Sequence, residues 1–166
     1  KEQIINQAFK FHSQGNTLGA AKLYQHFIDQ GYKDHRVFAN YGVILKNLGN
    51  LQEAELSLRK AIEINPNFAM AHHNRGSILI DLGKLKEAEL STLKAIEINP
   101  DYAEAHYNLG NILKDLGKYN DAINCYQKAI KLNNCFSAAK VGLIDSKKEI
   151  CDWSDQKTEN TWLKTL

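Results

Sequence analysis

Four asparagines recur at a fixed interval along the chain: Asn6, Asn40, Asn74 and Asn108 lie 34 residues apart. A carboxamide carries both a hydrogen-bond donor and an acceptor, the pair that each residue of an extended peptide backbone presents. Asparagine is a mediocre helix former that competes for backbone hydrogen bonds, so helix propensity does not account for four of them in one register. The pattern predicts recognition of a peptide backbone, provided that the fold brings the amides into one line. The alternative is that each amide bonds a neighbouring helix or faces water.

The histidines form no recognisable metal or catalytic pattern. His72 and His106 are 34 residues apart, whereas the adjacent His72 and His73 would point about 100° apart on a helix. Neither arrangement matches the i, i+4 spacing with which helical histidines bind a metal. No glycine-rich phosphate loop, nucleophile elbow or convergent acid–base pair is visible. We therefore expect this segment to hold no metal or cofactor and not to be an enzyme.

The overall composition is that of an ordinary globular protein. Net charge is +2, from 21 basic and 19 acidic residues, which gives no electrostatic footprint for nucleic acid or an anionic membrane. No apolar run approaches the roughly 18 residues that span a bilayer, and there is no signal-peptide pattern. Cys125, Cys135 and Cys151 are odd in number and lack CxxC spacing, so we expect reduced thiols. These features predict a cytoplasmic protein with no nucleic-acid or membrane partner.

A 34-residue repeat explains the spacing of the asparagines. Three further series keep the same interval: Gly15, Gly49, Gly83 and Gly117; Ala20, Ala54, Ala88 and Ala122; Ala8, Gly42, Gly76 and Gly110. Pro66 and Pro100, the only two prolines, are also 34 apart, and residues 51–67 and 85–101 are near copies. Such self-similarity is the signature of a repeat architecture.

Each repeat contains two helical patterns. In the third repeat, a first apolar stripe stops at Gly83, and a second stripe follows from Leu85 to Ile98. The Asn-Pro pair then ends the second helix, because proline disfavours a helical residue before it. Gly76 and Ala88 fall where the two helices must approach closely, and a larger side chain there would push them apart. The repeat is therefore predicted to be a helix–turn–helix hairpin.

These residues resemble the tetratricopeptide repeat, a 34-residue helix pair with small residues at the helix contacts and a terminal proline. The resemblance covers four units, 1–34, 35–68, 69–102 and 103–136, and Tyr32 and Asn134 replace the proline in the first and last of them. Residues 137–149 read as one more helix that caps the last hairpin. The resemblance implies an all-α, right-handed superhelical solenoid of four hairpins and a C-terminal capping helix.

In this family the first helix of each hairpin lines a concave groove, which would place the asparagines there. The residues expected to bind a peptide are Asn6, Asn40, Asn74, Asn108, His73, Tyr107, Ser77, Asn111, Lys46 and Lys114. Ile5, Ala39, Phe9 and Val43 are groove candidates from the same register. Asp81 and Asp115 accompany the two lysines, so the lining is mixed in charge and shows no lysine clamp for a carboxylate terminus. The expected partner is a protein or peptide in an extended conformation.

Residues 150–166 break the period. The sequence CDWSD at Cys151–Asp155 resembles the junction into the catalytic region of O-GlcNAc transferase and its SPINDLY-type relatives, in which the repeats recruit protein substrates. Because the chain starts at Lys1 and stops at Leu166 within an amphipathic stretch, we expect it to be a piece of a longer protein. The resemblance implies the substrate-recruiting arm of an O-linked glycosyltransferase. The alternatives are a stand-alone scaffold or adaptor, a module that self-associates through its terminal repeats, and a tail whose Trp153 packs on the end of the solenoid.

Overall fold

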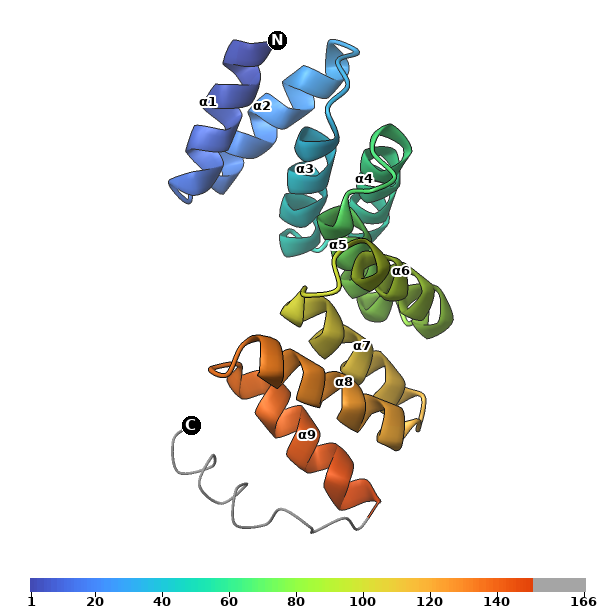
Figure 1. Cartoon of the computed structure of the whole chain (residues 1–166). Helices are drawn as coiled ribbons and strands as arrows, with labels where there is room; N and C mark the ends of the chain where they lie inside the picture. The colour runs from blue at the N-terminus through green and yellow to red at the C-terminus, as the bar shows by residue number, and fades with distance from the viewer. Residues whose placement is uncertain (151–166) are drawn as a thin grey trace.

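The computed structural model of the chain describes residues 1–150, and this range contains nine α-helices and no strand. The helices are α1 (Glu2–Ser13), α2 (Thr17–Asp29), α3 (His35–Asn47), α4 (Leu51–Ile64), α5 (Ala69–Asp81), α6 (Leu85–Ile98), α7 (Ala103–Asp115), α8 (Tyr119–Leu132) and α9 (Ser137–Glu149). Consecutive helices pack as antiparallel hairpins that follow one another from the N-terminal to the C-terminal end of the molecule (Figure 1). The predicted all-α helical solenoid with a final capping helix is confirmed. The tail from Cys151 onward lies outside the described residues.

The ends of the helices are set by the residues that the repeat keeps. Gly49, Gly83 and Gly117 have φ angles of 83°, 72° and 74°, a left-handed conformation that glycine adopts without a steric penalty. The second helices α4 and α6 end at Asn65 and Asn99, whose backbones are extended at φ −136° and −132°. A proline follows each of these two asparagines and prevents the helix from continuing. The helix boundaries predicted for the third repeat are therefore confirmed.

The cores of the second and fourth hairpins each depend on a glycine that faces a large side chain of the partner helix. A Cβ atom at Gly42 would lie 2.9 Å from Cγ of Leu58, and one at Gly110 would lie 2.6 Å from the ring of Tyr126. A Cβ atom at Gly142 of α9 would lie 2.7 Å from the same Tyr126 ring. The fully buried tyrosine thus fits between two helices only because both lack a side chain there. This close approach is what the recurring small residues provide.

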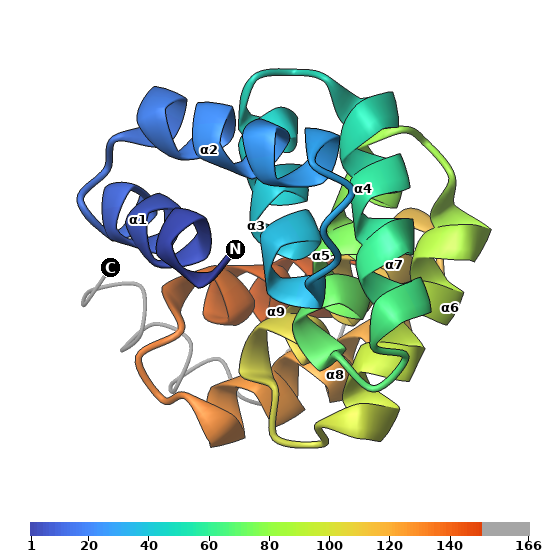
Figure 2. The same cartoon turned by 90° about the horizontal axis from the view of Figure 1, so that it is seen from above.

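The hairpins stack along a curve. The first helices of successive hairpins touch one another, α3 against α5, α5 against α7 and α7 against α9, whereas the second helices have no comparable contact within the described range. Seen from above, α4 and α6 lie outside α3 and α5 (Figure 2). The face formed by the first helices is therefore the inner face of the curve. None of the described helices is both long and apolar enough to cross a membrane.

The first junction between hairpins differs from the others. α2 ends at Asp29 after 13 residues, whereas α4, α6 and α8 have 14 residues each. Gly31 at φ 72° and Tyr32 replace the Asn-Pro pair, and residues 30–34 connect α2 to α3. α2 packs on α3 less extensively than α4 packs on α5. The first hairpin consequently packs less closely on the second hairpin than the later hairpins pack on one another.

Candidate functional site

The four predicted amides lie at one position of four first helices, α1, α3, α5 and α7. Asn40, Asn74 and Asn108 are half-buried, and Asn6 is exposed. None of them is buried in the core, so all four retain solvent-accessible surface. Their side-chain partners differ from one hairpin to the next.

Asn40 is held by a buried tyrosine of the preceding hairpin. Its Nδ2 donates a long hydrogen bond of 3.4 Å to Oη of Tyr24, which also lies 3.2 Å from Nδ1 of His12. Burial raises the pKa of Tyr24 and the bond from Asn40 lowers it in part, so the phenol stays neutral at physiological pH. A neutral phenol can accept from Asn40 while donating to His12. Among the described residues nothing donates to Oδ1 of Asn40, which leaves its acceptor for a ligand.

Asn108 has a comparable neighbour in His73. Its Nδ2 lies 3.5 Å from Nδ1 of His73, whose ring stacks on Tyr102 with a centroid separation of 4.7 Å. Burial is the main cause that lowers the pKa of His73 below 6.5; Glu104 opposes the shift and Lys46 adds to it. The imidazole is therefore neutral at physiological pH, and its Nδ1 can accept from the amide. The donor end of Asn108 is thus directed to a neighbouring helix.

The other two amides have no such neighbour. No hydrogen bond joins the side chains of Asn6 or Asn74 to another residue in the range 1–150. The alternative interpretation, in which the amides bond neighbouring helices, therefore holds only for Asn40 and Asn108. Each of these two residues uses only its Nδ2 donor. That alternative leaves the carbonyl oxygens of both residues unengaged.

Several other predicted site residues already bridge helices. Nζ of Lys46 on α3 donates to Oγ of Ser77 at 2.5 Å and pairs with Asp81 at 3.1 Å, and both of these partners lie on α5. Oδ1 of Asn111 accepts a 2.8 Å hydrogen bond from Oη of Tyr126. These contacts compensate the Lys46 charge and tie neighbouring helices together. By contrast, the side-chain carbonyl oxygens of the four amides accept no hydrogen bond from any residue in the range 1–150.

Lys114 lies further along the solenoid, in a polar cleft of about 470 Å³. The cleft is lined by Lys114, Asp115, Tyr119, Asp145, Lys148 and Glu149. It lies at the C-terminal ends of α7 and α9 and the start of α8, and its lining contains two lysines and three carboxylates. This part of the surface is mixed in charge, as the sequence predicted.

The position one residue before each amide does not line the groove in the first two hairpins. Ile5 is 5% exposed and Ala39 is fully buried, so both belong to the core and the expectation for them is wrong. The reason is the rotation of about 100° per residue, which turns this position towards the next hairpin. In later hairpins the same position stacks on aromatic rings, with Tyr107 4.9 Å from the centroid of Phe136. His73 and Tyr107 remain half-buried and keep part of their surface on the inner face.

The two histidines that recur at the repeat interval have a structural role that the sequence analysis did not assign. Nε2 of His72 lies 2.9 Å from the carbonyl oxygen of Pro66, and Nε2 of His106 lies 2.9 Å from that of Pro100. Each imidazole therefore fastens the loop that enters its helix. The signal was present as a histidine six residues after each proline. Within residues 1–150 no group of three or more histidine, cysteine or acidic side chains could hold a metal.

The cysteines in the described range are free thiols. Cys125 is half-buried and Cys135 is exposed. Burial, with a smaller contribution from Asp121, raises the pKa of Cys125 to about 11, so its reactive thiolate is scarce at neutral pH. The reduced state of the thiols stays a prediction, and Cys151 lies outside the described residues.

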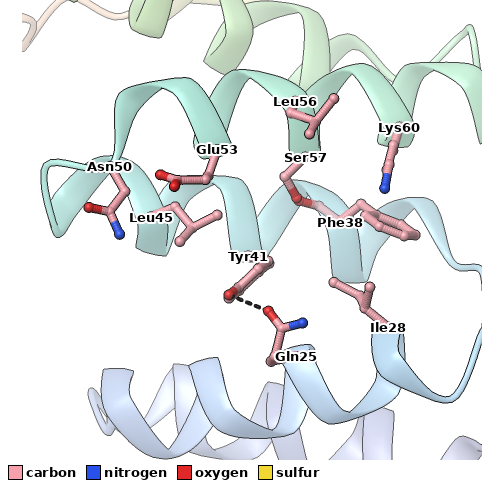
Figure 3. Close-up of a pocket in the computed structure, with 10 residues that line it drawn as sticks. All are labelled: Gln25, Ile28, Phe38, Tyr41, Leu45, Asn50, Glu53, Leu56, Ser57 and Lys60. Atoms are coloured by element: carbon pink, nitrogen blue, oxygen red, sulfur yellow. Dashed lines mark hydrogen bonds between the residues drawn. The ribbon is translucent and has the colours of Figure 1, made fainter.

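A second hollow, which the sequence analysis missed, lies on the opposite side of the molecule between α2 and α4. It has a volume of about 310 Å³ and is lined by Ile28, Phe38 and Leu56 among others, with a 2.6 Å hydrogen bond from Oη of Tyr41 to Oε1 of Gln25 across it (Figure 3). The hollow follows from the looser first junction. The sequence signal for it was Gly31-Tyr32 in place of Asn-Pro.

Comparison with known proteins agrees with this architecture. Family models described as tetratricopeptide repeat match residues 35–68, 57–89 and 103–134, and one described as TPR repeat matches residues 76–117. No curated protein matches the chain.

Solved structures of similar fold include a crystal structure of MamA protein, with 21% identity, a TM-score of 0.81 and coverage of 98% of this chain and 87% of that one. MamA from residue 41 to its end, from Desulfovibrio magneticus RS-1, has 21% identity and a TM-score of 0.82 over 99% of this chain and 91% of that one. A tetratricopeptide repeat protein from Parabacteroides merdae ATCC 43184 has 21% identity and a TM-score of 0.81 over 99% and 66%. At this identity the similarity shows the fold alone.

Proposed function

Because residues 35–134 of this chain are tetratricopeptide repeats, a scaffold suited to protein–protein interaction, we propose that the inner face binds an extended segment of a partner protein through its backbone. The observation that carries this proposal is the set of half-buried amides at one position of three helices that touch in succession. Asn40, Asn74 and Asn108 occupy that position on α3, α5 and α7.

The dimensions of the fold suit a peptide strand. Packed helices lie roughly 8–10 Å apart, and an extended strand rises about 3.3 Å per residue. Successive amides would therefore meet the backbone at about every third residue. Since each carboxamide can accept from an N–H and donate to a C=O, this contact is independent of the partner's side chains.

The charges of the inner face favour backbone recognition over a charged ligand. The charge of Lys46 is compensated by Asp81. The cleft around Lys114 contains two lysines and three carboxylates, so its positive charge is compensated as well. The amides retain unbonded carbonyl oxygens that a peptide N–H can reach. The partner that this lining supports is an uncharged stretch of main chain rather than an acidic terminus.

The proposal is tested by selecting binders from a random 16-residue peptide library on the chain of residues 1–166. The dissociation constant of a selected, fluorescein-labelled peptide is then measured by fluorescence polarisation for the parent and for the triple variant Asn40→Ala, Asn74→Ala and Asn108→Ala. Each lost hydrogen bond contributes about 0.5–1.5 kcal/mol, so we expect the Kd to rise about tenfold or more.

The matched control is the double variant Asn120→Ala and Asn124→Ala, which removes two exposed amides from α8 on the outer side. The control should bind like the parent, and all variants should melt at closely similar temperatures. If the folded triple variant binds as tightly as the parent, or if no peptide is selected at all, the proposed function is wrong.

A second candidate function extends the first. The CDWSD sequence at Cys151–Asp155 favours a recruiting arm that delivers bound segments to a linked O-glycosyltransferase, whereas a stand-alone adaptor needs only the inner face. The coding sequence beyond Leu166 separates the two, since a two-lobed nucleotide-sugar-dependent region is required for the arm. Sedimentation equilibrium of the chain tests the third candidate, self-association through the terminal repeats.

A further inference from the structure

At the N-terminal end of the inner face, a small pocket adjoins the first of the half-buried amides. It is lined by Phe9, His12 and Ser13 of α1 and by Asn40 of α3, and its volume is about 260 Å³. Sites for small molecules have volumes of roughly 300–1,000 Å³. The pocket is thus below that range and is of a size for one side chain.

The pocket is partly aromatic, and no carboxylate, lysine or arginine lines it. The buried ring of Tyr24 packs edge-on against Phe9 and His12, at centroid distances of 6.1 Å and 6.0 Å. The guanidinium of Arg36 lies 5.4 Å from the Phe9 centroid and is paired with Asp34 at 2.8 Å. Because that charge is compensated and no carboxylate lines the pocket, the walls favour an apolar occupant over an ionised one.

The lining also differs from the rest of the inner face. At the position three residues after each amide, the first two hairpins carry Phe9 and Val43, whereas the next two carry Ser77 and Asn111. Ser77 accepts from Lys46, and Asn111 accepts from Tyr126. This position of the inner face is therefore apolar in the first two hairpins and polar in the next two, which gives a bound peptide a direction as well as a register.

We infer that this pocket takes one apolar side chain of the bound peptide, from the residue whose backbone N–H donates to Oδ1 of Asn40. Asn40 makes the link, because the same residue both lines the pocket and carries the free acceptor. Tyr24 is a positioning residue: it holds Nδ2 of Asn40 and leaves Oδ1 for the peptide. This inference rests on the proposed function. It adds selectivity for one side chain to an inner face that otherwise contacts only the main chain of the peptide.

The test uses the chain of residues 1–166 and the most enriched peptide from the random library, labelled with fluorescein. Each peptide residue is replaced in turn by alanine, and the Kd is measured for the parent, for Asn40→Ala, for Ser13→Phe and for Asn47→Phe. Ser13 is exposed at the end of α1, so a phenylalanine there can fill the pocket without entering the core. Asn47 is the residue at the same position of the next hairpin, is also exposed, and serves as the matched control.

We expect the enriched peptides to share one apolar position. Its replacement by alanine should raise the Kd on the parent about tenfold or more, in keeping with the loss of a buried apolar side chain. Ser13→Phe should raise the Kd by a similar factor and should no longer distinguish the alanine peptide from the original. Asn47→Phe should bind both peptides as the parent does, and Asn40→Ala should weaken both.

The results that would contradict the pocket inference differ from those that would contradict backbone binding by the inner face. Enriched peptides without a shared apolar position, or unchanged affinity of a folded Ser13→Phe variant, would overturn the pocket inference while the triple amide variant still tests the groove. If Ser13→Phe weakens binding and Asn40→Ala does not, the assigned register is wrong. Should Ser13→Phe fail to melt cooperatively, the alanine scan on the parent decides alone, because the inference requires one dominant apolar residue.

Discussion

At the scale of single residues, binding of a peptide backbone depends on how the amides are oriented. The repeat spacing predicts where Asn40 and Asn108 lie, but not that their Nδ2 atoms point to Tyr24 and His73. Those neighbours come from other hairpins, 16 and 35 residues away. At the repeat interval Tyr24 recurs only as Tyr126, which bonds Asn111 instead, and His73 does not recur. No local pattern in the sequence could have shown them. The orientation is a property of packing between hairpins.

The buried imidazole of His73 predicts a dependence of stability on pH. Its pKa in the folded chain is below 6.5, so the unfolded chain binds a proton first as the pH falls. The stabilising contribution is therefore complete above pH 6.5 and is lost as the pH falls towards the folded-state pKa. We expect thermal melts of the parent at pH 7.5 and pH 5.5 to differ more than those of His73→Phe, which keeps a ring against Tyr102.

His26→Gln is the control for this comparison, because His26 is exposed on α2. It should show the same difference between the two pH values as the parent. An equal acid-induced loss of stability in His73→Phe and the parent would remove His73 as its cause.

At the scale of helices and hairpins, most of the structure could be predicted because the signals are local. Gly83 and the Asn-Pro pair at 99–100 end the helices of the third repeat where expected, and residues 137–149 form one helix. The looser first junction was not predicted, although Gly31 and Tyr32 mark it. How closely two hairpins pack depends on side chains from both, which the pattern of one repeat does not contain.

The contact between Gly76 and Thr92 gives a test of the packing within a hairpin. A Cβ at Gly76 would collide with Oγ1 of Thr92, a fully buried hydroxyl with no hydrogen-bond partner in the described range. Gly76→Ala should therefore cost about 1–3 kcal/mol in overpacking, offset by about 1 kcal/mol of helix propensity. In a Thr92→Ala background the collision is absent, and the same change should be neutral or stabilising.

Urea unfolding of the parent, the two single variants and the double variant completes the cycle. The double variant should be more stable, by about 1 kcal/mol or more, than the sum of the two single effects on the free energy of unfolding predicts. Identical effects of Gly76→Ala in both backgrounds would mean that the two helices do not meet at these residues.

At the scale of the whole molecule, a one-dimensional stack places one residue of every repeat on the same face. This is why a spacing in the sequence can predict a binding surface for Asn40, Asn74 and Asn108 without any catalytic motif. The apolar pocket beside Asn40 could not be predicted in the same way, because Phe9 and Asn40 belong to different hairpins. The hollow between α2 and α4 likewise is lined by residues of two hairpins, so the pattern of one repeat does not contain it.

The central claim is that the inner face holds the main chain of its partner, and it can be measured by replacing single peptide bonds of the selected peptide with esters. An ester keeps the side chain and removes only the N–H donor. We predict that the Kd rises about two- to tenfold at positions about three residues apart, in keeping with a lost hydrogen bond, and that these increases vanish in the triple amide variant. Affinity that is unaffected by any ester, or that falls equally in the triple variant, would contradict the account.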